Sequence, residues 1–331
     1  MTRRILRTFL IFSVVLSSCE REDSGVSGGL PERSAEYDLE NKVVRSYLDL
    51  LDMMPYRDGD YSYSVVDDYY AMTTSYRKDH PYPVSVEWEF PAGGGNQRIL
   101  VADNPDFTDP VIYSISGSAV SYDIYNLIPG KHYHWKVTSS SGEYVDGGEF
   151  MTTGRRRFLK VDNICNVRDL GGILTADGRK RIRFGLVFRG AVLDLRTDSE
   201  AVGITSSPLG EDIDYVRFSN ANDYYYDKCW TSDVYILAIQ WLIDRLREGK
   251  PVYFHCIYGA DRTGTLAFLL ESLLGVDENE LAKDYELTSF SYGLESAPRR
   301  RGPKNEVRAF LAKKISGEDL DWLTGYLLES V

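Results

Sequence analysis

The sequence predicts two folded parts in one chain: a small all-β sandwich, followed by an α/β domain whose central, mostly parallel sheet is flanked by helices. Two observations lead to this prediction. Residues 81–154 alternate apolar and polar side chains over short stretches separated by Pro, Gly, Asn and Asp, which is the pattern of antiparallel strands. Residues 155–331 instead alternate short apolar stretches with longer stretches of helical period, which indicates an α/β order.

Length and composition are consistent with both parts. The chain has 331 residues, and 43% of them are hydrophobic, which is enough for two cores. Its formal net charge of −12 argues against a protein that binds nucleic acid, because phosphate backbones are bound by clustered Lys and Arg. Basic clusters at 155–157, 179–183 and 299–304 are interpreted as solvated loops. Attraction of an anionic substrate is the alternative.

The first residues are typical of an export signal. Three arginines precede an apolar run at 10–16, which is too short to span a bilayer. Leu-Ser-Ser-Cys then ends at Cys19 and resembles the lipobox of bacterial lipoproteins. We therefore expect a signal peptide at 1–18, lipidation of Cys19 and a polar, flexible tether at 19–35. The protein would be exported and anchored to a membrane, on the outer-membrane, periplasmic or cell-surface side; an ordinary secretory signal is the alternative.

The middle of the chain has one recognisable motif. Residues 36–80 are rich in Tyr and Asp and contain no recognisable motif. Within 81–154, Tyr125–Val137 (YNLIPGKHYHWKV) resembles the corner of a fibronectin type III-like domain, which implies a spacer or a module that binds a glycan or a protein. His132 and His134 alternate with aromatic residues and are interpreted as strand faces rather than metal ligands, because no acidic cluster has the spacing of ligands.

Two further elements are predicted in the α/β part. Residues 176–190 (ADGRKRIRFGLVFRG) are interpreted as two short strands joined by a glycine turn. Residues 232–249 predict a helix with Ser232 as its N-cap and Gly249 as its stop. The apolar stretch 251–256 follows this helix as the central parallel strand.

The stretch His255–Gly264 (HCIYGADRTG) connects that strand to another helix. Leucines at helical spacing follow the stretch, up to a stop at Gly275. The loop therefore ends at a helix N-terminus, where N–H groups and the helix dipole favour an anion. Arg262 adds a planar charge that suits phosphate oxygens, and such surroundings favour the thiolate form of Cys256. The pattern predicts a thiolate beside a phosphate-binding loop.

This pattern, Cys-x5-Arg-Thr, resembles the signature of the protein tyrosine phosphatase superfamily. It is most similar to the bacterial branch with His-Cys-x-x-Gly-x-Asp-Arg-Thr-Gly. Two upstream motifs also resemble that branch, NVRDLGG at 166–172 and DLRTDSE at 194–200. The resemblance covers about residues 158–331, and it implies the α/β cysteine-phosphatase fold for the domain at 155–331.

The resemblance implies a phosphomonoester hydrolase, most directly a protein tyrosine phosphatase, whose substrate is a phosphorylated protein or a small phosphomonoester. Cys256 would attack phosphorus to form a cysteinyl-phosphate, without any metal or cofactor. His255 would order the loop and help to keep Cys256 ionised, and Thr263 would donate to the sulfur as it leaves. The phosphate oxygens would be held by the loop residues Ile257, Tyr258, Gly259, Ala260, Asp261 and Arg262.

The general acid that protonates the leaving oxygen has several candidates. Such enzymes place an Asp on a loop upstream of the cysteine, and Asp223 lies in a polar stretch at 219–227. Asp261 is its competitor, because this branch carries an Asp inside the phosphate loop. Asp227 or another carboxylate is the third possibility.

Two departures from the branch bear on activity and substrate. Relatives have a helix-length segment between the residue that matches Gly190 and the Asp-Leu-Arg motif, whereas here Asp194 follows almost at once, which would change one wall of the pocket. Many relatives have a Lys where this chain has Ala260, and that Lys suits highly charged lipid phosphates. The sequence therefore favours aryl phosphates. Alternatives are an inositol polyphosphate or phosphoinositide phosphatase, and a catalytically impaired, phosphatase-fold binding lipoprotein.

Overall fold

The computed structural model describes residues 34–49, 81–89, 95–161, 164, 166–190, 194–204, 214–219, 231–288, 290 and 304–331. Several predictions concern residues outside this set, namely the signal peptide at 1–18, Cys19, most of the tether, Asp223, Asp227 and the link at 191–193. The described residues form two units. Unit 1 comprises the described residues of 34–39 and 81–154, and unit 2 those of 40–49 and 155–331.

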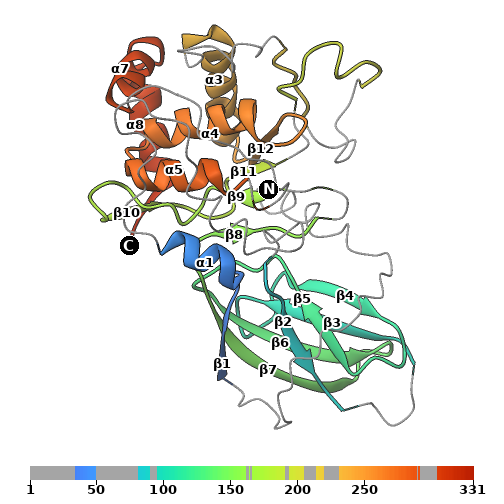
Figure 1. Ribbon diagram of the computed structural model, residues 1–331. Coiled ribbons are helices and arrows are strands. Elements are labelled where there is room, and N and C mark those ends of the chain that lie inside the picture. Colours follow the sequence, from blue (N-terminus) through green and yellow to red (C-terminus); the bar gives the residue numbers. More distant parts are fainter. Residues whose placement is uncertain are drawn as a thin grey trace. The chain divides into compact units, whose positions relative to one another are not determined.

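The described residues of unit 1 form two β-sheets around one core (Figure 1). The larger sheet has the order β1 (Ser34–Asp38), β7 (Tyr144–Thr153), β6 (His132–Ser139), β3 (Gln97–Ala102) and β4 (Val111–Ile115). The smaller sheet pairs β2 (Val84–Glu87) with β5 (Ser121–Ile124). The short antiparallel strands predicted within 81–154 are therefore present.

The alternating pattern of these strands explains their packing. Ile99, Val101, Val137 and Phe150 come from three neighbouring strands, and all are buried in the core between the sheets. The corner motif also has a structural role, because the Tyr133 hydroxyl accepts a hydrogen bond from the Ile128 N–H at 3.0 Å. This bond fixes the turn before β6 to the start of that strand.

Strand β1 was not predicted, and it corrects the division of the chain before residue 81. Residues 34 and 35, which were assigned to the tether, lie in β1, which pairs in parallel with β7. The Tyr- and Asp-rich segment 36–80 is also divided, since its described residues contribute to both units. In unit 2 they form helix α1 (Lys42–Leu48), and Tyr47 on this helix donates a hydrogen bond to Glu286 at 2.8 Å.

Unit 2 is a mixed α/β structure. Its main sheet has the order β12 (Val252–His255), β11 (Val187–Gly190), β9 (Arg168–Asp169) and β8 (Arg157–Phe158). A second pair joins β10 (Lys180–Ile182) to β13 (Leu328–Ser330). The larger helices are α3 (Asp233–Arg247), α4 (Asp261–Leu273), α5 (Glu278–Glu286), α7 (Lys304–Lys314) and α8 (Gly317–Leu327).

The prediction of a mostly parallel sheet was wrong for the described strands. Only the pairing of β11 with β12 is parallel among the three pairings of the main sheet in the described residues, and the other two are antiparallel. The reason lies in the connections. Parallel neighbours need a long crossover, and helix α3 lies in the connection between β11 and β12. The links from β8 to β9 and from β9 to β11 contain no described helix.

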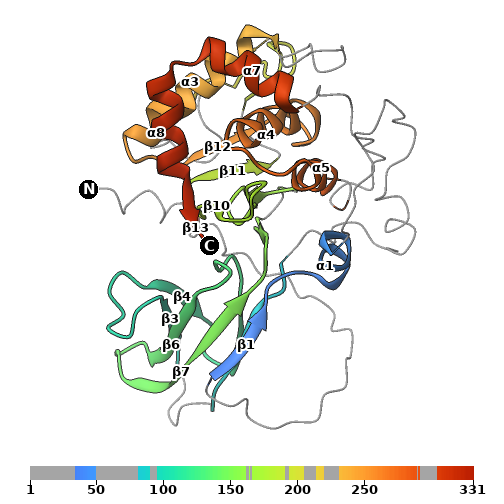
Figure 2. The same ribbon diagram turned by 90° about the vertical axis from the view of Figure 1, so that its left-hand side faces the viewer.

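The helices gather on one side of the main sheet, as both ribbon views show for α3, α4, α7 and α8 (Figure 1, Figure 2). Helix α4 is buried from Arg262 to Leu273, because the sheet and other helices surround it. The predicted helix limits are confirmed: Ser232 lies at the N-cap position of α3, and Gly249 and Gly275 have positive φ values of 73° and 76° after α3 and α4. Among the described residues, no helix has the length and apolar character to cross a bilayer.

The two short strands and the glycine turn predicted at 176–190 are present. Strands β10 and β11 both form there, but they belong to different sheets. Strand β10 pairs with β13, near the C-terminal end of the chain, while β11 pairs with β9 and β12. The turn between them contains Gly185 in a left-handed conformation, with φ of 84°. It redirects the chain between two sheets rather than closing a hairpin.

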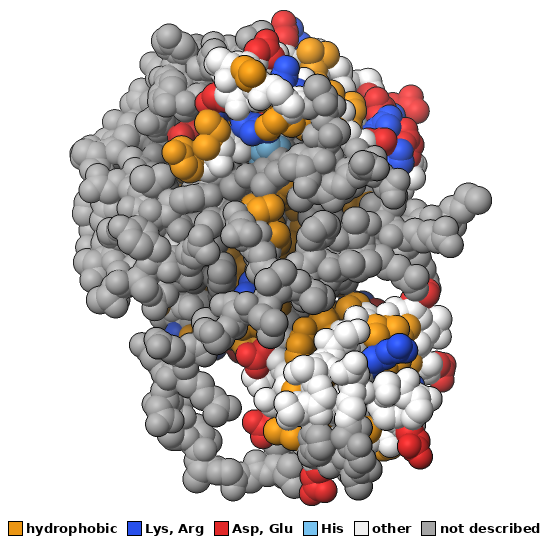
Figure 3. Space-filling view, turned by 90° about the vertical axis from the view of Figure 1, so that its right-hand side faces the viewer, with side chains coloured by type: hydrophobic (Ala, Val, Ile, Leu, Met, Phe, Trp, Pro, Cys, Tyr) orange, Lys and Arg blue, Asp and Glu red, His pale blue; other side chains and the backbone are white. Residues whose placement is uncertain are grey.

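Some members of the basic clusters are paired with carboxylates. Arg157 binds buried Asp169 at 3.2 Å, and Arg156 is buried in an ion pair with Glu280. Arg181 binds Glu329 at 2.8 Å across the β10–β13 pair. On the face drawn in Figure 3, the described part of the molecule carries Lys and Arg interspersed with Asp and Glu. In the first cluster, Arg156 and Arg157 are buried, whereas in the second Arg179 and Lys180 are exposed, as expected for a solvated segment. Residues 299–303 of the third lie outside the described set.

Candidate active site

The loop at 256–260 connects the end of β12 to the start of α4. Strand β12 is completely buried and pairs with β11 along its whole length, so the position at which the loop begins is fixed. Ala260 lies at the N-cap position and has no side chain that could accept from the helix. The first N–H groups of α4 therefore have no side-chain cap there, and an anion is the natural partner for such groups.

Three glycines allow close packing around this loop. Gly259 has φ of 66°, and a Cβ there would lie 2.5 Å from the Gly190 carbonyl oxygen. A Cβ on Gly190 would lie 2.7 Å from the Tyr253 hydroxyl, and one on Gly264 would lie 2.5 Å from the Tyr285 ring. The loop, the end of β11 and helix α5 can approach one another only because these side chains are missing.

Two buried side chains hold the outer side of the loop. Asn166 donates to the carbonyl oxygens of Tyr258 at 3.2 Å and Gly259 at 3.1 Å. Arg189 donates to the same Gly259 oxygen at 3.1 Å. In a trans peptide the C=O and N–H groups point in opposite directions, so the N–H groups of Gly259 and Ala260 point away from Asn166 and Arg189. These contacts give the loop an inner side lined by N–H donors.

An ion cluster beneath the loop holds these supports in place. Asp284 on α5 accepts from Arg168 Nε at 2.9 Å and also pairs with Arg189, and all three side chains are buried. Burial by itself raises the pKa of Asp284, but Arg168 and Arg189 outweigh it and hold that pKa well below its ordinary value. Burial and the neighbouring Arg189 lower the pKa of Arg168 to about 10. The cluster ties β9, β11 and α5 together.

The nucleophile candidate and its neighbouring histidine lie at the start of the loop. Cys256 is only 4% exposed, and His255 Nδ1 lies 2.9 Å from the Cys256 carbonyl oxygen. Burial, together with the nearby Arg196, lowers the pKa of His255 well below its ordinary value. The imidazole is therefore neutral at physiological pH. It orders the loop through Nδ1 but adds no positive charge.

Arg262 is held by a carboxylate from the DLRTDSE motif. Its two terminal nitrogens bind Glu200 at 2.7 Å and 3.0 Å, and the first also donates to the Leu195 carbonyl oxygen at 2.9 Å. Hydrogen bonds from Arg262 and from the Thr197 N–H and hydroxyl lower the pKa of Glu200 to about 2. This two-point contact fixes the plane of the guanidinium group next to the loop.

The rest of that motif forms a wall beside the loop. The Leu195 N–H donates to the His255 carbonyl oxygen at 2.8 Å. Buried Asp194 binds Arg196 with distances of 2.6 Å and 3.2 Å, and it also accepts from the Tyr215 hydroxyl. The segment that follows the short link at 191–193 therefore still contacts the site.

The other predicted residues have different positions. Buried Thr263 Oγ1 makes no hydrogen bond within the described part of the chain, so the expected donation to sulfur is not formed here. Asp261 lies in the first turn of α4 and accepts a long hydrogen bond of 3.4 Å from the Tyr285 hydroxyl. Ile257 and Tyr258 are 40% and 53% exposed at the rim. Asp223 and Asp227 lie outside the described residues, so the choice of general acid stays open.

Several supporting residues were not identified from the sequence as members of the site. Asn166 and Glu200 lie inside motifs that were recognised, so the motif spacing was an available signal for both. Arg189 lies in a stretch that was interpreted only as a strand and Asp284 lies in no quoted stretch, and only the tertiary structure brings the two together.

Comparisons with known proteins find tyrosine phosphatases that are similar to about half of this chain. The sequence model of the tyrosine phosphatase family matches residues 159–222 and 218–327. A protein of Cupriavidus necator, provisionally named a tyrosine-protein phosphatase, is 28% identical over 221 residues, which cover 50% of this chain and 81% of that protein. A tyrosine-protein phosphatase of Nostoc commune is 29% identical over 163 residues, which cover 44% of this chain and 54% of the relative.

Proposed function

Because this chain belongs to the tyrosine phosphatase family, we propose that it is a protein tyrosine phosphatase that acts through a cysteinyl-phosphate on Cys256. One observation carries the proposal. Cys256 begins a loop in which two N–H groups point away from the supporting side chains of Asn166 and Arg189. The loop ends at the N-terminus of α4, and there Glu200 holds the Arg262 guanidinium group in place. A nucleophile and a dianion-binding loop are thus adjacent in one short segment.

The proposed reaction has two steps. The Cys256 thiolate attacks phosphorus, the bond from phosphorus to the substrate oxygen breaks, and that oxygen takes a proton from a general acid. Water then attacks the cysteinyl-phosphate, which releases inorganic phosphate and restores the thiolate. Loop N–H groups and Arg262 stabilise the charge on the three other phosphate oxygens in both steps.

The neutral state of His255 limits what it contributes. Positive potential for the thiolate and for the phosphate then comes from Arg262 and the N-terminus of α4. His255 acts as a positioning residue that holds the Cys256 carbonyl group. Asp223, Asp261 and Asp227 remain the candidates for the general acid.

An aryl phosphate is the substrate class that the described residues fit best. Ile257 and Tyr258 offer apolar surface at the rim of the loop, which an aromatic ring can contact. Ala260 provides no charge, and the arginines at 156, 157 and 181 are engaged by carboxylates. A highly charged inositol polyphosphate would need a more basic pocket, so it is the less favoured substrate.

The test is to assay two variants of the purified chain that lacks residues 1–19, with p-nitrophenyl phosphate and phosphotyrosine peptides. Cys256→Ser should abolish turnover while vanadate and phosphate still bind, because the loop and Arg262 remain. Arg262→Ala should lose both anion binding and turnover. Full hydrolysis by Cys256→Ser, or turnover that fails without added metal, would contradict the thiolate mechanism.

The general acid can be assigned with the same two substrates. Phosphotyrosine has a poor leaving group, whereas nitrophenolate leaves with little protonation. The acid variant should therefore lose much more activity on phosphotyrosine than on p-nitrophenyl phosphate. For each of Asp223→Ala, Asp227→Ala and Asp261→Ala, the activity lost on phosphotyrosine is divided by the activity lost on p-nitrophenyl phosphate. The variant with the largest ratio identifies the general acid.

We further propose that the protein is an exported lipoprotein, anchored by lipid on Cys19, and that unit 1 is a fibronectin type III-like spacer or a module that binds a glycan or protein. The first part rests on the signal-like N-terminus and the lipobox. The second rests on the corner motif and on the hydrogen bond from Ile128 to the Tyr133 hydroxyl. In a bacterial host, Cys19→Ala should abolish acyl labelling and membrane association. Continued labelling of the variant would contradict the anchor.

A further inference from the structure

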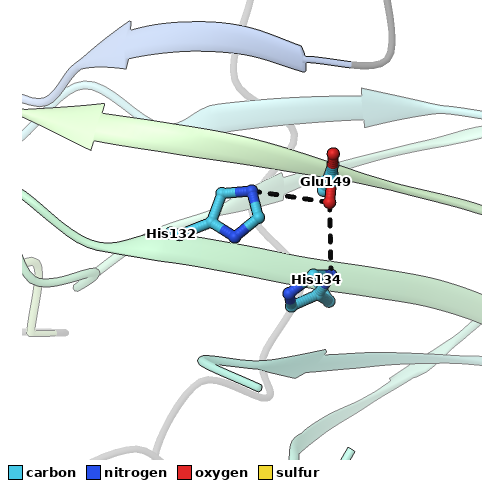
Figure 4. A group of neighbouring side chains, drawn as sticks. All are labelled: His132, His134 and Glu149. Carbon is cyan, nitrogen blue, oxygen red and sulfur yellow. Dashed lines mark ion pairs between the residues drawn. The ribbon is translucent and has the colours of Figure 1, made fainter. Parts of the chain in front are cut away.

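Unit 1 carries a cluster of two histidines and a glutamate on the outer face of its larger sheet (Figure 4). His132 and His134 lie two residues apart on β6, so their side chains stand on the same face. Glu149 on β7 is the cross-strand partner of His134. In the sequence alone, no acidic residue lies at the spacing of a third metal ligand. The pairing of β6 with β7 supplies that missing carboxylate.

The distances within the cluster suit a small metal ion. Glu149 Oε2 lies 3.5 Å from His132 Nε2 and 3.6 Å from His134 Nδ1. The three candidate ligand atoms all lie within 4.8 Å of one another. Ligand atoms bound at about 2.0–2.2 Å to a tetrahedral zinc ion are about 3.4 Å apart. The two separations that involve Glu149 therefore already match. A small rotation of the exposed His132 ring would bring the two imidazole nitrogens to the same distance.

The backbone beneath the cluster is well supported. Strand β6 pairs with β3 on one side and β7 on the other, and β7 also pairs with β1. On the opposite face, Tyr133 and Phe150 are buried in the core of unit 1. The ligand positions are thus held by the sheet, while the side chains remain accessible, with exposures of 44% for His132, 19% for His134 and 45% for Glu149.

Neighbouring cations are directed to other partners. Lys136 is the next residue of β6 on the same face, but its Nζ lies 4.1 Å from the centre of the Phe107 ring. Lys131, just before β6, binds Asp103 at 3.4 Å. Neither ammonium group pairs with Glu149 in the described contacts, so the carboxylate faces the two imidazoles.

We propose that His132, His134 and Glu149 form a binding site for a divalent transition-metal ion, with Zn²⁺ as the ion that this donor set fits best. Two imidazoles and one carboxylate are typical zinc ligands, whereas Mg²⁺ and Ca²⁺ prefer oxygen alone. Three protein ligands leave one tetrahedral position, which water completes. The site belongs to unit 1 and is independent of the proposed phosphatase chemistry.

The experiment is a Zn²⁺ titration by calorimetry, using the chain that lacks residues 1–19 and carries Cys256→Ser, which removes the reactive thiol as a competing ligand. One Zn²⁺ per chain should bind to this parent protein. His132→Ala, His134→Ala and Glu149→Gln should each weaken that binding at least tenfold, because even an outer-shell partner changes metal affinity by about 10–100-fold. Glu143→Gln is the matched control, since Glu143 is an exposed carboxylate in the turn before β7, and it should bind like the parent.

Thermal unfolding provides a second measurement. Zn²⁺ should raise the melting temperature of the parent and of Glu143→Gln, but not that of the double variant with His132→Ala and His134→Ala. The substituted side chains lie on the outer face, so far-UV circular dichroism should show that all variants remain folded. The proposal is overturned if the parent binds no Zn²⁺ at micromolar concentration, or if the double variant binds it as tightly as the parent.

Discussion

Glu200 determines where the charge of Arg262 is held. The two-point contact between them uses both terminal nitrogens of the guanidinium group, so the plane of that group is set before a substrate arrives. Under the proposed mechanism, Glu200 contributes by orienting the Arg262 guanidinium group in advance, without touching the reacting atoms. It is a positioning residue that a list of charged residues would not reveal.

Glu200→Gln should therefore reduce kcat/KM by about three- to tenfold, since charge-assisted hydrogen bonds are worth about 1.5–3 kcal/mol and part of this contact remains. Vanadate should bind more weakly by a similar factor. Because the pKa of Glu200 is about 2, the carboxylate is ionised throughout an assay range of pH 5–8, and the size of the effect should not change with pH. Glu143→Gln is the control; equal kinetics for both variants would contradict the role of Glu200.

Glu271 is a second residue whose role depends on its surroundings. It is buried on α4, its two carboxyl oxygens make no hydrogen bond within the described residues, and its pKa is raised well above the ordinary value by burial and by Asp284. A carboxyl group whose pKa is higher in the folded state takes up a proton on folding. Its contribution to stability is complete below the unfolded-state pKa and is lost as the pH rises towards the folded-state pKa.

Glu271→Gln should accordingly make stability less dependent on pH. Relative to the wild type, the variant should gain stability progressively between pH 5 and pH 8, because an amide does not have to lose a proton. Urea unfolding at several pH values measures this directly. A constant difference between variant and wild type across that range would contradict the raised pKa.

At the scale of elements, the loop at 256–260 depends on glycine at one position. Gly259 combines a positive φ with a contact that leaves no room for a Cβ. Gly178 has the same φ of 66° but lies in open space at an exposed turn. Comparing substitutions at Gly259 and Gly178 therefore separates the effect of backbone strain from the effect of a steric clash.

Both Gly→Ala variants should lose about 1–2 kcal/mol of stability from the left-handed conformation. Only Gly259→Ala should also lose activity, by more than about a hundredfold, because displaced loop N–H groups no longer meet the phosphate oxygens. The measurements are urea unfolding and turnover of p-nitrophenyl phosphate. Normal turnover by Gly259→Ala would show that the loop tolerates a side chain there.

Helix α5 supports the loop through Asp284. Removing one partner of a buried ion cluster leaves uncompensated charge, which typically costs about 3–5 kcal/mol. Asp284→Asn should therefore lower the urea midpoint strongly, whereas Glu278→Gln, at an exposed position of the same helix, should not. Since the pKa of Asp284 is depressed, its stabilising effect is present above the unfolded-state pKa and declines in acid. The difference between Asp284→Asn and wild type should therefore shrink as the pH falls below about 4.

At the scale of the whole molecule, unit 1 is discontinuous in sequence. Strand β1 pairs with β7 and precedes the long stretch at 40–80 that leads to β2. Leu39, directly after β1, is buried in the core of unit 1. An autonomous unit should therefore include the residues before position 40.

A chain in which residues 34–39 are joined to 81–154 by a short Gly-Ser linker should fold as an all-β protein. Residues 81–154 alone should be less stable, because the edge of β7 and part of the core are exposed. Circular dichroism and thermal unfolding of the two fragments measure the difference. Equal stability would show that β1 is dispensable.

The local features of both units could be predicted from the sequence. Helix α3, strand β12, helix α4 and the loop between them follow from periodicity and stop signals that span fewer than about 20 residues. Strand direction could not be predicted in the same way. The antiparallel pairing of β8, β9 and β11, and the separation of β10 from β11 into different sheets, depend on competition between distant partners.

The sequence by itself determined the local geometry of the loop, because Cys256 and Arg262 lie in a short strand–loop–helix segment that follows from a local residue pattern. Only the tertiary structure decided which distant groups meet: Glu200 with Arg262, Asp284 with two arginines, and Glu149 with His132 and His134. The physical reason is that hydrogen bonds and ion pairs act over a few ångströms. Which residues come within that range depends on sheet register and helix packing, and neither leaves a local signal in the chain.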